Sequence, residues 1–333
     1  MKRLLLTLGL TLLTVASATS QTSGRVYRMA IIAPSGPVSN LSETGNLPAL
    51  FPELRRLGYI EGQNLTVERR SAGEHPERLP ELVREVIALK PDIIYTTSGR
   101  VLQHIKAATT TVPAVGSASD PVGYGLAASL ARPGGNITGI SVDAGVEIFG
   151  KRLELLRELV PGAKTVAFLT PRDGWDNILG KAAKEAATRA GLSLVGPPLD
   201  TPIGEAEYRR VFAAMMEQRP DALLVSDYNE NMTHRRLIAD FARTHRLPAV
   251  YPFRAFAEDG GLLAYAPDLL DLQRHTATMI DTILRGGKAG DIPFYLPTRY
   301  QMFINMKSAR DIDLDVPPAL LTMADEVIDS APR

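Results

Sequence analysis

Residues 90–96 read KPDIIYT and residues 219–225 read RPDALLV. Each stretch places a Pro-Asp pair directly before a short apolar run. Proline fixes its own backbone angle and has no N–H to give to a β-ladder, so it belongs at the entry of a strand. A short apolar run after such a turn is typical of a strand buried in a parallel sheet. The repeated signature predicts two units built on one plan.

The segments around this signature also repeat, and in the same order. Upstream, RMAIIAP (28–34) resembles TVAFLTP (165–171); downstream, after one helical pattern, VPAV (112–115) resembles LPAVY (247–251). Strand patterns that alternate with helical patterns indicate βαβ units. We therefore predict the α/β class, with two doubly wound parallel-sheet lobes. The expected strands are 28–33, 65–69, 92–96, 113–116, 137–142, 165–169, 193–196, 222–226, 249–251 and 262–266, and the expected helices are 76–89, 150–159, 179–190, 205–218 and 270–285.

The first residues predict export. A basic start (Met1–Arg3) precedes an apolar run to Val15, and Ala16-Ser17-Ala18 gives a small-residue cleavage pattern. We interpret residues 1–18 as a cleaved signal peptide. The alternative, a membrane anchor, is disfavoured because the run is too short for a bilayer of ~30 Å. Since the chain has no cysteine, a lipid anchor is not expected.

Composition and motifs argue against several function classes. The 333-residue chain has a formal net charge of zero and no basic cluster, so a nucleic-acid partner is not expected. It has neither a G-x-S-x-G elbow nor a phosphate-binding G-x-x-x-x-G-K-S/T loop. Its five histidines show no H-E-x-x-H or other paired spacing. We therefore expect neither enzyme activity nor a bound metal.

One stretch resembles a cofactor loop. Gly123–Ala128 fits G-x-G-x-x-A, and Asp143 follows at about the distance of a ribose-binding carboxylate. A dinucleotide turn must open a long helix, whereas here Pro133 and two glycines interrupt the chain soon afterwards. We interpret the stretch as a short helix capped by Asp120 at a cleft edge and expect no cofactor.

Doubly wound lobes bind ligands at the carboxyl ends of their strands, so two facing lobes share one cleft. The residues just after the predicted strands are the candidate ligand-binding residues: Ser35, Gly36, Thr97, Ser98, Gly99, Ser119 and Asp120 from the first lobe, and Thr170, Trp175, Asp227, Tyr228, Tyr251 and Phe253 from the second. Helix capping is the alternative for Ser35, Ser98 and Asp120. Core packing is the alternative for Phe253.

The candidate residues also suggest a ligand chemistry. Asp120 or Asp227 would pair with a ligand ammonium, and the loops at Ser35 and Ser98 would hold a carboxylate, because helix N-termini favour anions. Trp175 follows a polar loop and is the candidate for stacking on the ligand.

The chain resembles the ABC-transporter substrate-binding proteins, a family whose members include tryptophan and tyrosine binders. The resemblance runs from about Arg28 to Ile328 and is carried by LGYIEGQN (57–64), DPVG (120–123), SLARPGGNITG (129–139), GKRLELL (150–156), HRLPAVY (245–251), GGLLAY (260–265) and ADEVI (324–328). Two places depart from the family pattern, the loop at 171–175 and Ala266 before Pro267. Both lie near the expected cleft, so ligand identity does not follow from the resemblance.

The resemblance implies a type I periplasmic-binding fold with a three-segment hinge. Crossings are expected near 141–142, 267–268 and 296–298, so that residues 26–141 with 268–297 form one lobe and residues 142–267 with 298–330 form the other. It further implies a periplasmic monomer that closes on a small-molecule ligand and docks on an ABC permease with its ATPase. The alternative is a periplasmic sensor that docks on a membrane receptor kinase.

Overall fold

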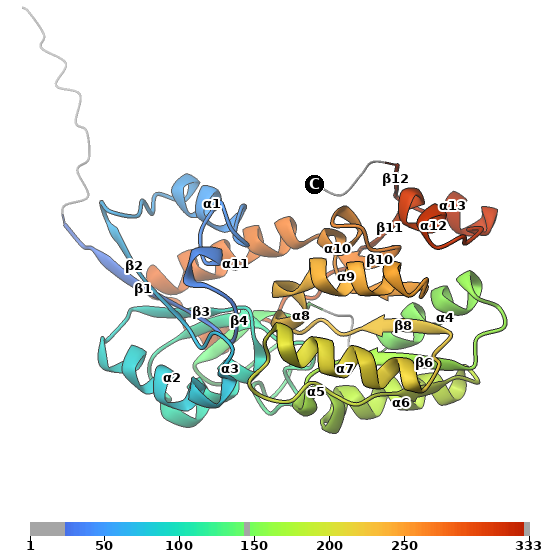
Figure 1. Ribbon diagram of the computed structural model, residues 1–333. Coiled ribbons are helices and arrows are strands. Elements are labelled where there is room, and N and C mark those ends of the chain that lie inside the picture. The colour runs from blue at the N-terminus through green and yellow to red at the C-terminus, as the bar shows by residue number, and fades with distance from the viewer. Residues whose placement is uncertain (1–23, 143–146, 330–333) are drawn as a thin grey trace, which may run out of the picture.

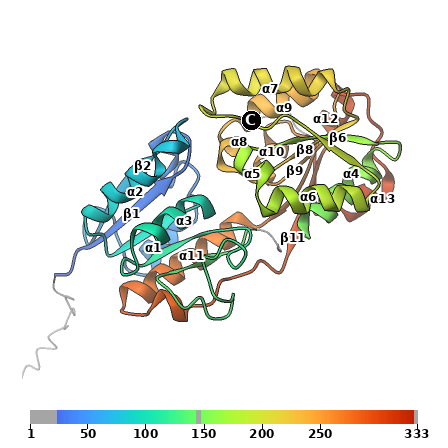
Figure 2. The same ribbon diagram turned by 90° about the horizontal axis from the view of Figure 1, so that it is seen from below.

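The computed structural model describes residues 24–142 and 147–329, so the predicted signal peptide (1–18) and Asp143 lie outside the described residues. Two sheets form two lobes that stand side by side (Figures 1 and 2). The first sheet has five strands, and all of its neighbouring strands are parallel. Their order is β2 (Leu65–Ser71), β1 (Tyr27–Ala33), β3 (Ile93–Thr96), β4 (Ala114–Ser117), β5 (Ile137–Ile140).

Helices cover both faces of the first sheet. Along β1, Met29 and Ile31 face one apolar cluster, while Ala30 and Ile32 face another, as the two-residue period of a strand requires. The first cluster lies under α1 (Leu50–Arg56) and α11 (Leu269–Leu284); the second lies under α2 (Leu79–Ala88) and α3 (Gly99–Ala108). Helix α11, drawn in orange beside the blue α1, comes from a distant part of the chain (Figure 1).

The second sheet has seven strands. Their order is β12 (Glu326–Ile328), β11 (Tyr300–Asn305), β10 (Leu263–Pro267), β9 (Ala249–Tyr251), β8 (Ala222–Val225), β6 (Thr165–Leu169), β7 (Ser193–Val195). The β10–β11 pair is antiparallel, whereas the sequence predicted parallel pairing throughout. Strands β11 and β12 were not predicted either, because no repeat of the first lobe marks them and β12 is short and partly exposed.

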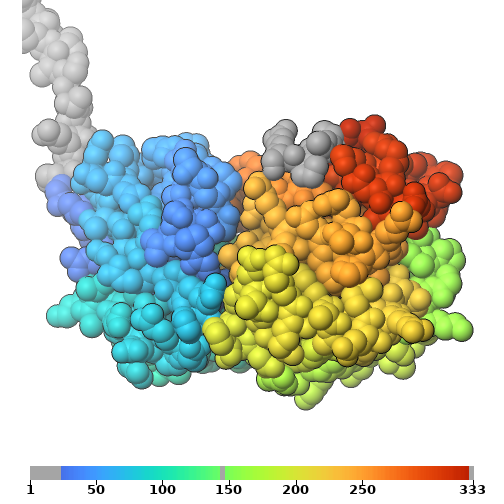
Figure 3. Space-filling model, viewed as in Figure 1, coloured from blue at the N-terminus to red at the C-terminus, as the bar shows by residue number. Residues whose placement is uncertain are grey.

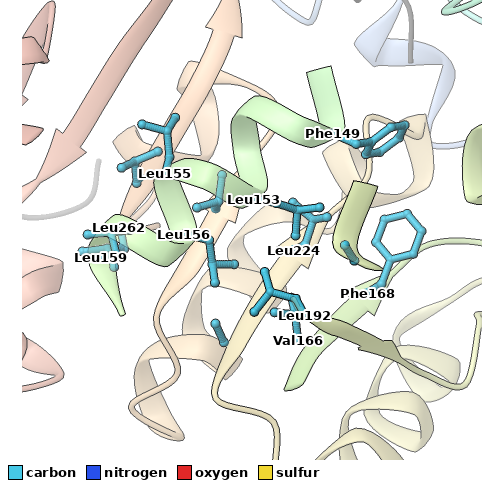
Figure 4. Packing of buried hydrophobic residues seen from close by; sticks show 14 of the residues in the cluster. Phe149, Leu153, Leu155, Leu156, Leu159, Val166, Phe168, Leu192, Leu224 and Leu262 are labelled. Carbon is cyan, nitrogen blue, oxygen red and sulfur yellow. The ribbon is translucent and has the colours of Figure 1, made fainter. Parts of the chain in front are cut away.

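The second sheet is also covered on both faces. On one face Leu153 and Leu156 of α4 (Ile148–Leu159) pack against Val166 and Leu224 of the central strands (Figure 4). The opposite face is covered by α7 (Glu205–Glu217) and α9 (Arg235–Thr244). The helices of this lobe are α4 (Ile148–Leu159), α5 (Arg172–Asp176), α6 (Ile178–Arg189), α7 (Glu205–Glu217), α8 (Asn229–Thr233), α9 (Arg235–Thr244), α10 (Arg254–Glu258), α12 (Met306–Asp311) and α13 (Pro318–Met323). Short 3-10 turns occur at η1 (Val38–Asn40), η2 (Pro76–Arg78) and η3 (Ala289–Asp291).

The aspartates of the two Pro-Asp stretches make equivalent hydrogen bonds in the two lobes. Asp92 accepts a hydrogen bond from the N–H of Arg28, which lies in the neighbouring strand β1. Asp221 accepts bonds from the N–H groups of Lys164 and Thr165 at the start of β6. In each lobe the aspartate therefore clamps the first residues of the adjacent strand, and the repeat seen in the sequence is a repeat of structure.

Three stretches of chain pass between the lobes. The chain leaves the first sheet after β5, returns to it from β10 through α11, and enters the second sheet again at β11. Near the last crossing, the N–H of Ser141 donates to the carbonyl of Tyr295, and the rings of Tyr265 and Tyr300 stack with centroids 5.5 Å apart. The exact domain limits stay a prediction. Among the helices of residues 24–142 and 147–329, none combines the length and the hydropathy of a membrane-spanning segment.

The stretch that resembles a dinucleotide turn is a series of tight turns, so the expected short helix after Asp120 is wrong. Asp120 Oδ1 accepts a 2.8 Å bond from the N–H of Gly123, and Gly125 adopts a left-handed φ of 66°. A Cβ at Gly123 would lie only 2.1 Å from the Asp120 carboxylate. The glycines at 123 and 125 are thus explained by the turn itself.

Candidate functional site

A cavity of about 190 Å³ lies where the two lobes meet. In the space-filling view the blue and cyan lobe abuts the yellow and orange lobe along a continuous seam (Figure 3). The cavity wall includes residues that follow β1, β3 and β4 in the first lobe and β6, β8 and β9 in the second. These are the carboxyl ends of parallel strands, the position where doubly wound sheets bind ligands.

The structure brings eight of the thirteen predicted site residues to this wall. They are Ser35, Thr97, Ser98, Gly99, Ser119, Asp227, Tyr228 and Phe253. Ser98 is both a cap and a wall residue, because its hydroxyl accepts from the N–H of Val101 at the start of α3. Ser35 caps no helix, and its buried hydroxyl has no hydrogen-bond partner among the described residues.

The other five predicted residues lie elsewhere. Trp175 packs at the edge of the second-lobe core, where the centroids of its ring and of the Phe168 ring are 5.9 Å apart. The Lys184 ammonium lies 4.2 Å from the centroid of the Trp175 ring. Tyr251 is fully buried and stacks on Phe256. Thr170 is also fully buried, Asp120 holds the turn described above, and Gly36 forms a bridge with Gly73.

Two hydrogen bonds join the lobes across the cavity, and three of their four residues were predicted for the site: Thr97, Ser119 and Asp227. The Ser119 hydroxyl donates to Asp227 Oδ2 at 2.9 Å, and the Asn229 amide donates to Thr97 Oγ1 at 2.9 Å. Among the described residues, Asp227 Oδ1 has no hydrogen-bond partner, and the residue is partly exposed. One oxygen of this carboxylate is therefore available to a ligand.

An ion-pair cluster that the site prediction did not include also joins the lobes. The Arg100 guanidinium, from the first lobe, donates to Glu230 Oε1 and, at 3.3 Å, to Asp173 Oδ1 in the second. The Glu230 side chain is only 2% exposed. Burial would lower the pKa of Arg100, but the charges of Glu230 and Asp173 outweigh it and raise that pKa. Arg100 follows the predicted strand 92–96, so its place near the cleft could be expected from the sequence. Its partners Glu230 and Asp173 lie in the other lobe, and no sequence spacing predicts that pairing.

Two tyrosines and an asparagine form a polar group on the wall. The Asn177 amide donates to the hydroxyl oxygens of Tyr124 and Tyr228, at 3.1 and 3.0 Å. The Asn177 side-chain oxygen caps α6 by accepting from the N–H of Leu179, so the amide is held in one orientation. Burial raises the pKa of both tyrosines well above its ordinary value, and the negative charges of Asp173 and Asp227 add to the effect. Both phenols are neutral at physiological pH.

Gln273 of α11 fixes the loop that forms another part of the wall. Its side-chain oxygen accepts from the N–H groups of Ala49 and Leu50, at 2.8 and 3.2 Å, and its amide donates to the carbonyl of Asn46. Asn46 and Leu47 line the cavity beside Gln273 itself. The late helix α11 therefore positions an early loop at the site.

The charged side chains on the described part of the wall are Arg100, Asp173, Asp227 and Glu230. Within the described residues there is no group of three or more histidine, aspartate or glutamate side chains that could hold a metal ion. The geometry suits reversible capture of a small molecule between two lobes.

Comparisons with known proteins agree with this geometry. Residues 37–328 match the family model described as ABC transporter substrate binding protein. A curated tyrosine-binding protein of Clostridioides difficile (strain R20291) is 23% identical over 259 residues, which are 77% of this chain and 73% of the relative.

Solved structures show the same fold. A conserved domain protein from Vibrio cholerae superposes with a TM-score of 0.81 at 23% identity, covering 91% of this chain and 100% of the other. An ABC domain from Streptococcus pneumonia, in complex with L-Trp, gives a TM-score of 0.78 at 23% identity with the same coverage. These likenesses confirm the predicted α/β class with two lobes.

Proposed function

The chain belongs to the family of ABC transporter substrate-binding proteins, and we propose that it captures an amino acid, with an aromatic one the first candidate, and delivers it to a membrane permease. The family is one of binding proteins, in line with the expectation that the chain is not an enzyme. In this proposal the protein acts in the periplasm after removal of residues 1–18, as a monomer and without a nucleic-acid partner.

The observation that carries the proposal is the cavity between the strand ends of both lobes. An apolar cavity of ~150 Å³ holds a benzene molecule, so about 190 Å³ fits one aromatic ring with a small polar group. The wall supplies aromatic side chains for such a body: Tyr95, Tyr124, Tyr228 and Phe253. The names of the two relatives, one tyrosine-binding and one in complex with L-Trp, support the same class of ligand.

The wall has groups for both ends of an amino acid. Asp227 Oδ1 would accept from the ligand ammonium, because Oδ2 already accepts from Ser119. The free hydroxyl of Ser35 and the first N–H groups of α3, beside Ser98, would hold the carboxylate. No charged donor is needed at the carboxylate end for this arrangement.

Hinge closure around the ligand would trap it in the cavity. The contacts of Ser119 with Asp227, of Thr97 with Asn229 and of Arg100 with Glu230 all join the lobes, and all must break when the cavity opens to solvent. A ligand that touches both lobes favours the closed form by its differential affinity for that form. The closed form would then dock on the permease.

A thermal-shift screen of the mature protein against the proteinogenic amino acids tests the proposal. A ligand at one hundred times its dissociation constant adds ~2.7 kcal/mol to the free energy of unfolding. We expect the largest shift from an aromatic amino acid. A screen in which no amino acid stabilises the protein would contradict the proposed ligand class, and NAD serves as the negative control.

A further inference from the structure

We propose that the positive charge of the ligand is its obligatory feature and that its carboxylate is dispensable, so that the site takes primary amines with an aromatic body, amino acids included. This inference rests on the proposed function and extends its ligand class to amines without a carboxylate. It predicts which half of an amino acid is recognised.

The balance of charge on the wall is the first argument. Three carboxylates, of Asp173, Asp227 and Glu230, face one guanidinium, of Arg100, which leaves a net charge of −2 on the described wall. A ligand ammonium lowers this excess, whereas a ligand carboxylate without an ammonium adds to it. Inside a closed cavity such charges interact more strongly than in water.

Arg100 cannot serve as the counter-ion of a ligand carboxylate. Its guanidinium is already paired with Glu230 and with Asp173, so its charge is matched more than once by the protein. Its Nε has no partner among the described residues and can still donate a hydrogen bond. That bond would orient a carboxylate without neutralising it.

Glu230 is the second argument. Its side chain is 2% exposed, it lines the cavity, and its Oε2 has no hydrogen-bond donor within the described part of the chain. A buried carboxylate oxygen without a donor is costly, and a nearby positive charge relieves that cost. Glu230 and the available oxygen of Asp227 both belong to the cavity wall, and together they favour an ammonium there.

The aromatic part of the wall fits the same ligand class. Tyr124 and Tyr228 stay neutral because burial raises their pKa, so they add no charge of their own. Aromatic rings attract a cation as well as an apolar body; Tyr95 and Phe253 also line the cavity, and the Arg100 guanidinium already lies 5.9 Å from the Tyr228 ring centroid. The wall therefore has several groups that favour an amine and hydroxyl or N–H groups alone for a carboxylate.

Two matched ligand series test the inference by isothermal calorimetry on the mature, full-length protein. One series is tyrosine, tyramine and 3-(4-hydroxyphenyl)propionate; the other is tryptophan, tryptamine and indole-3-propionate. We expect loss of the ammonium to weaken binding about a hundredfold, in line with a lost charged hydrogen bond, and loss of the carboxylate to weaken it less than about tenfold. The inference is overturned if loss of the carboxylate weakens binding as much as loss of the ammonium, or more.

Two variants then locate the effect. Glu230→Gln should reduce the preference for tyrosine over its deaminated analogue about tenfold, because a neutral amide replaces the carboxylate. The matched control is Glu74→Gln, which removes an exposed carboxylate at the lobe boundary that does not line the cavity, and it should leave the preference unchanged. An unchanged preference in folded Glu230→Gln overturns the role of Glu230.

The outcomes separate the inference from the proposed function. If a deaminated acid binds and the amines do not, a small-molecule binding protein remains but the inference is wrong. If no member of either series binds while another amino acid does, the aromatic ligand class is wrong. Calorimetry with the decarboxylated amine and the deaminated acid of that amino acid then tests the inference in the same way. The ranking of wild-type affinities decides the inference even where a variant fails to fold.

Discussion

The Ser119 hydroxyl donates a 2.9 Å hydrogen bond to the Asp227 carboxylate and thereby joins a strand end of one lobe to a strand end of the other. The two residues are 108 positions apart in the sequence. The bond uses one oxygen of Asp227 and fixes the orientation of the other. The carboxylate that we propose for the ligand ammonium is therefore oriented only when the cavity is closed, since opening the cavity removes the serine.

Replacing Asp227 should weaken binding with little change in fold. Asp227→Asn keeps an oxygen that accepts from Ser119 but removes the charge that faces the ligand ammonium. We expect the affinity for the best amino acid ligand to fall about tenfold to a hundredfold, as for a lost charged hydrogen bond, measured by calorimetry. The control is Trp175→Phe, which lies outside the cavity wall and should change affinity less than about twofold. An affinity unchanged in Asp227→Asn, or lowered equally in the control, would show that the cavity assignment is wrong.

Removing one partner of the buried Arg100–Glu230 ion pair should lower the stability of the fold more than removing both. Arg100→Met leaves Glu230 buried between the lobes without its counter-ion, which costs about 3 kcal/mol by analogy with other broken buried pairs. The double variant Arg100→Met, Glu230→Met replaces the pair by apolar groups and should regain most of that stability. Thermal unfolding of the four proteins in a double-mutant cycle measures the difference. Additive losses from the two substitutions would contradict a direct coupling.

Gln273 should control the order of the loop at the site. Gln273→Leu leaves the buried N–H of Leu50 and the N–H of Ala49 without their acceptor, which should lower the free energy of unfolding by about 2 kcal/mol. It should also increase amide hydrogen exchange of residues 41–50 and lower ligand affinity. Gln273→Glu, which keeps the accepting oxygen, should restore protection at Leu50. Equal exchange in the wild type and Gln273→Leu would be inconsistent with this anchoring role.

The strand clamp of Asp221 should make stability depend on pH. Hydrogen bonds from the N–H groups of Lys164 and Thr165 lower the pKa of Asp221 below its ordinary value of 3.8. A carboxyl whose pKa is lower in the folded state stabilises the fold above its unfolded-state pKa, and this contribution disappears as the pH falls through the folded-state pKa. Asp221→Asn should thus be less stable than the wild type at pH 7, and the gap should close as the pH falls below about 4. Urea unfolding across this range measures the difference in the free energy of unfolding between the two proteins. A difference that does not change with pH would show that the charge of Asp221 does not stabilise the fold.

The repeated parts of the fold could be predicted because local chemistry marks them. Pro-Asp before an apolar run fixes a strand entry, and the structure shows why, since Asp92 and Asp221 each clamp a neighbouring strand. The antiparallel strand β11 has no such marker and depends on the partner β10, so sequence alone did not reveal it. Asp120 does make a cap-type bond with the N–H of Gly123, but the helix expected after it does not form, because Gly125 adopts a left-handed φ of 66° that ends the helical turn.

The site was predictable as far as the strand ends. Ser98 and Ser119 follow strands of the first lobe, and Asp227 follows one of the second, so the topology alone brings them to the cavity. Trp175 also follows a strand, but the helix α5 that begins at Arg172 turns its ring toward the core. The pairing of Arg100 with Glu230 depends on how one lobe faces the other, and no local pattern in the sequence contains that information.

The late position of α11 has a consequence for the order in which this protein can fold during synthesis. The core of the first lobe includes Leu272, Ile280 and Leu284 of α11, whereas the strands of that lobe end at Ile140. A ribosome has therefore made most of the second lobe, from α4 to β10, before the first lobe can complete its core. A fragment that ends at residue 142 lacks one side of its apolar cluster, and the first lobe stays unfinished until α11 has been synthesised.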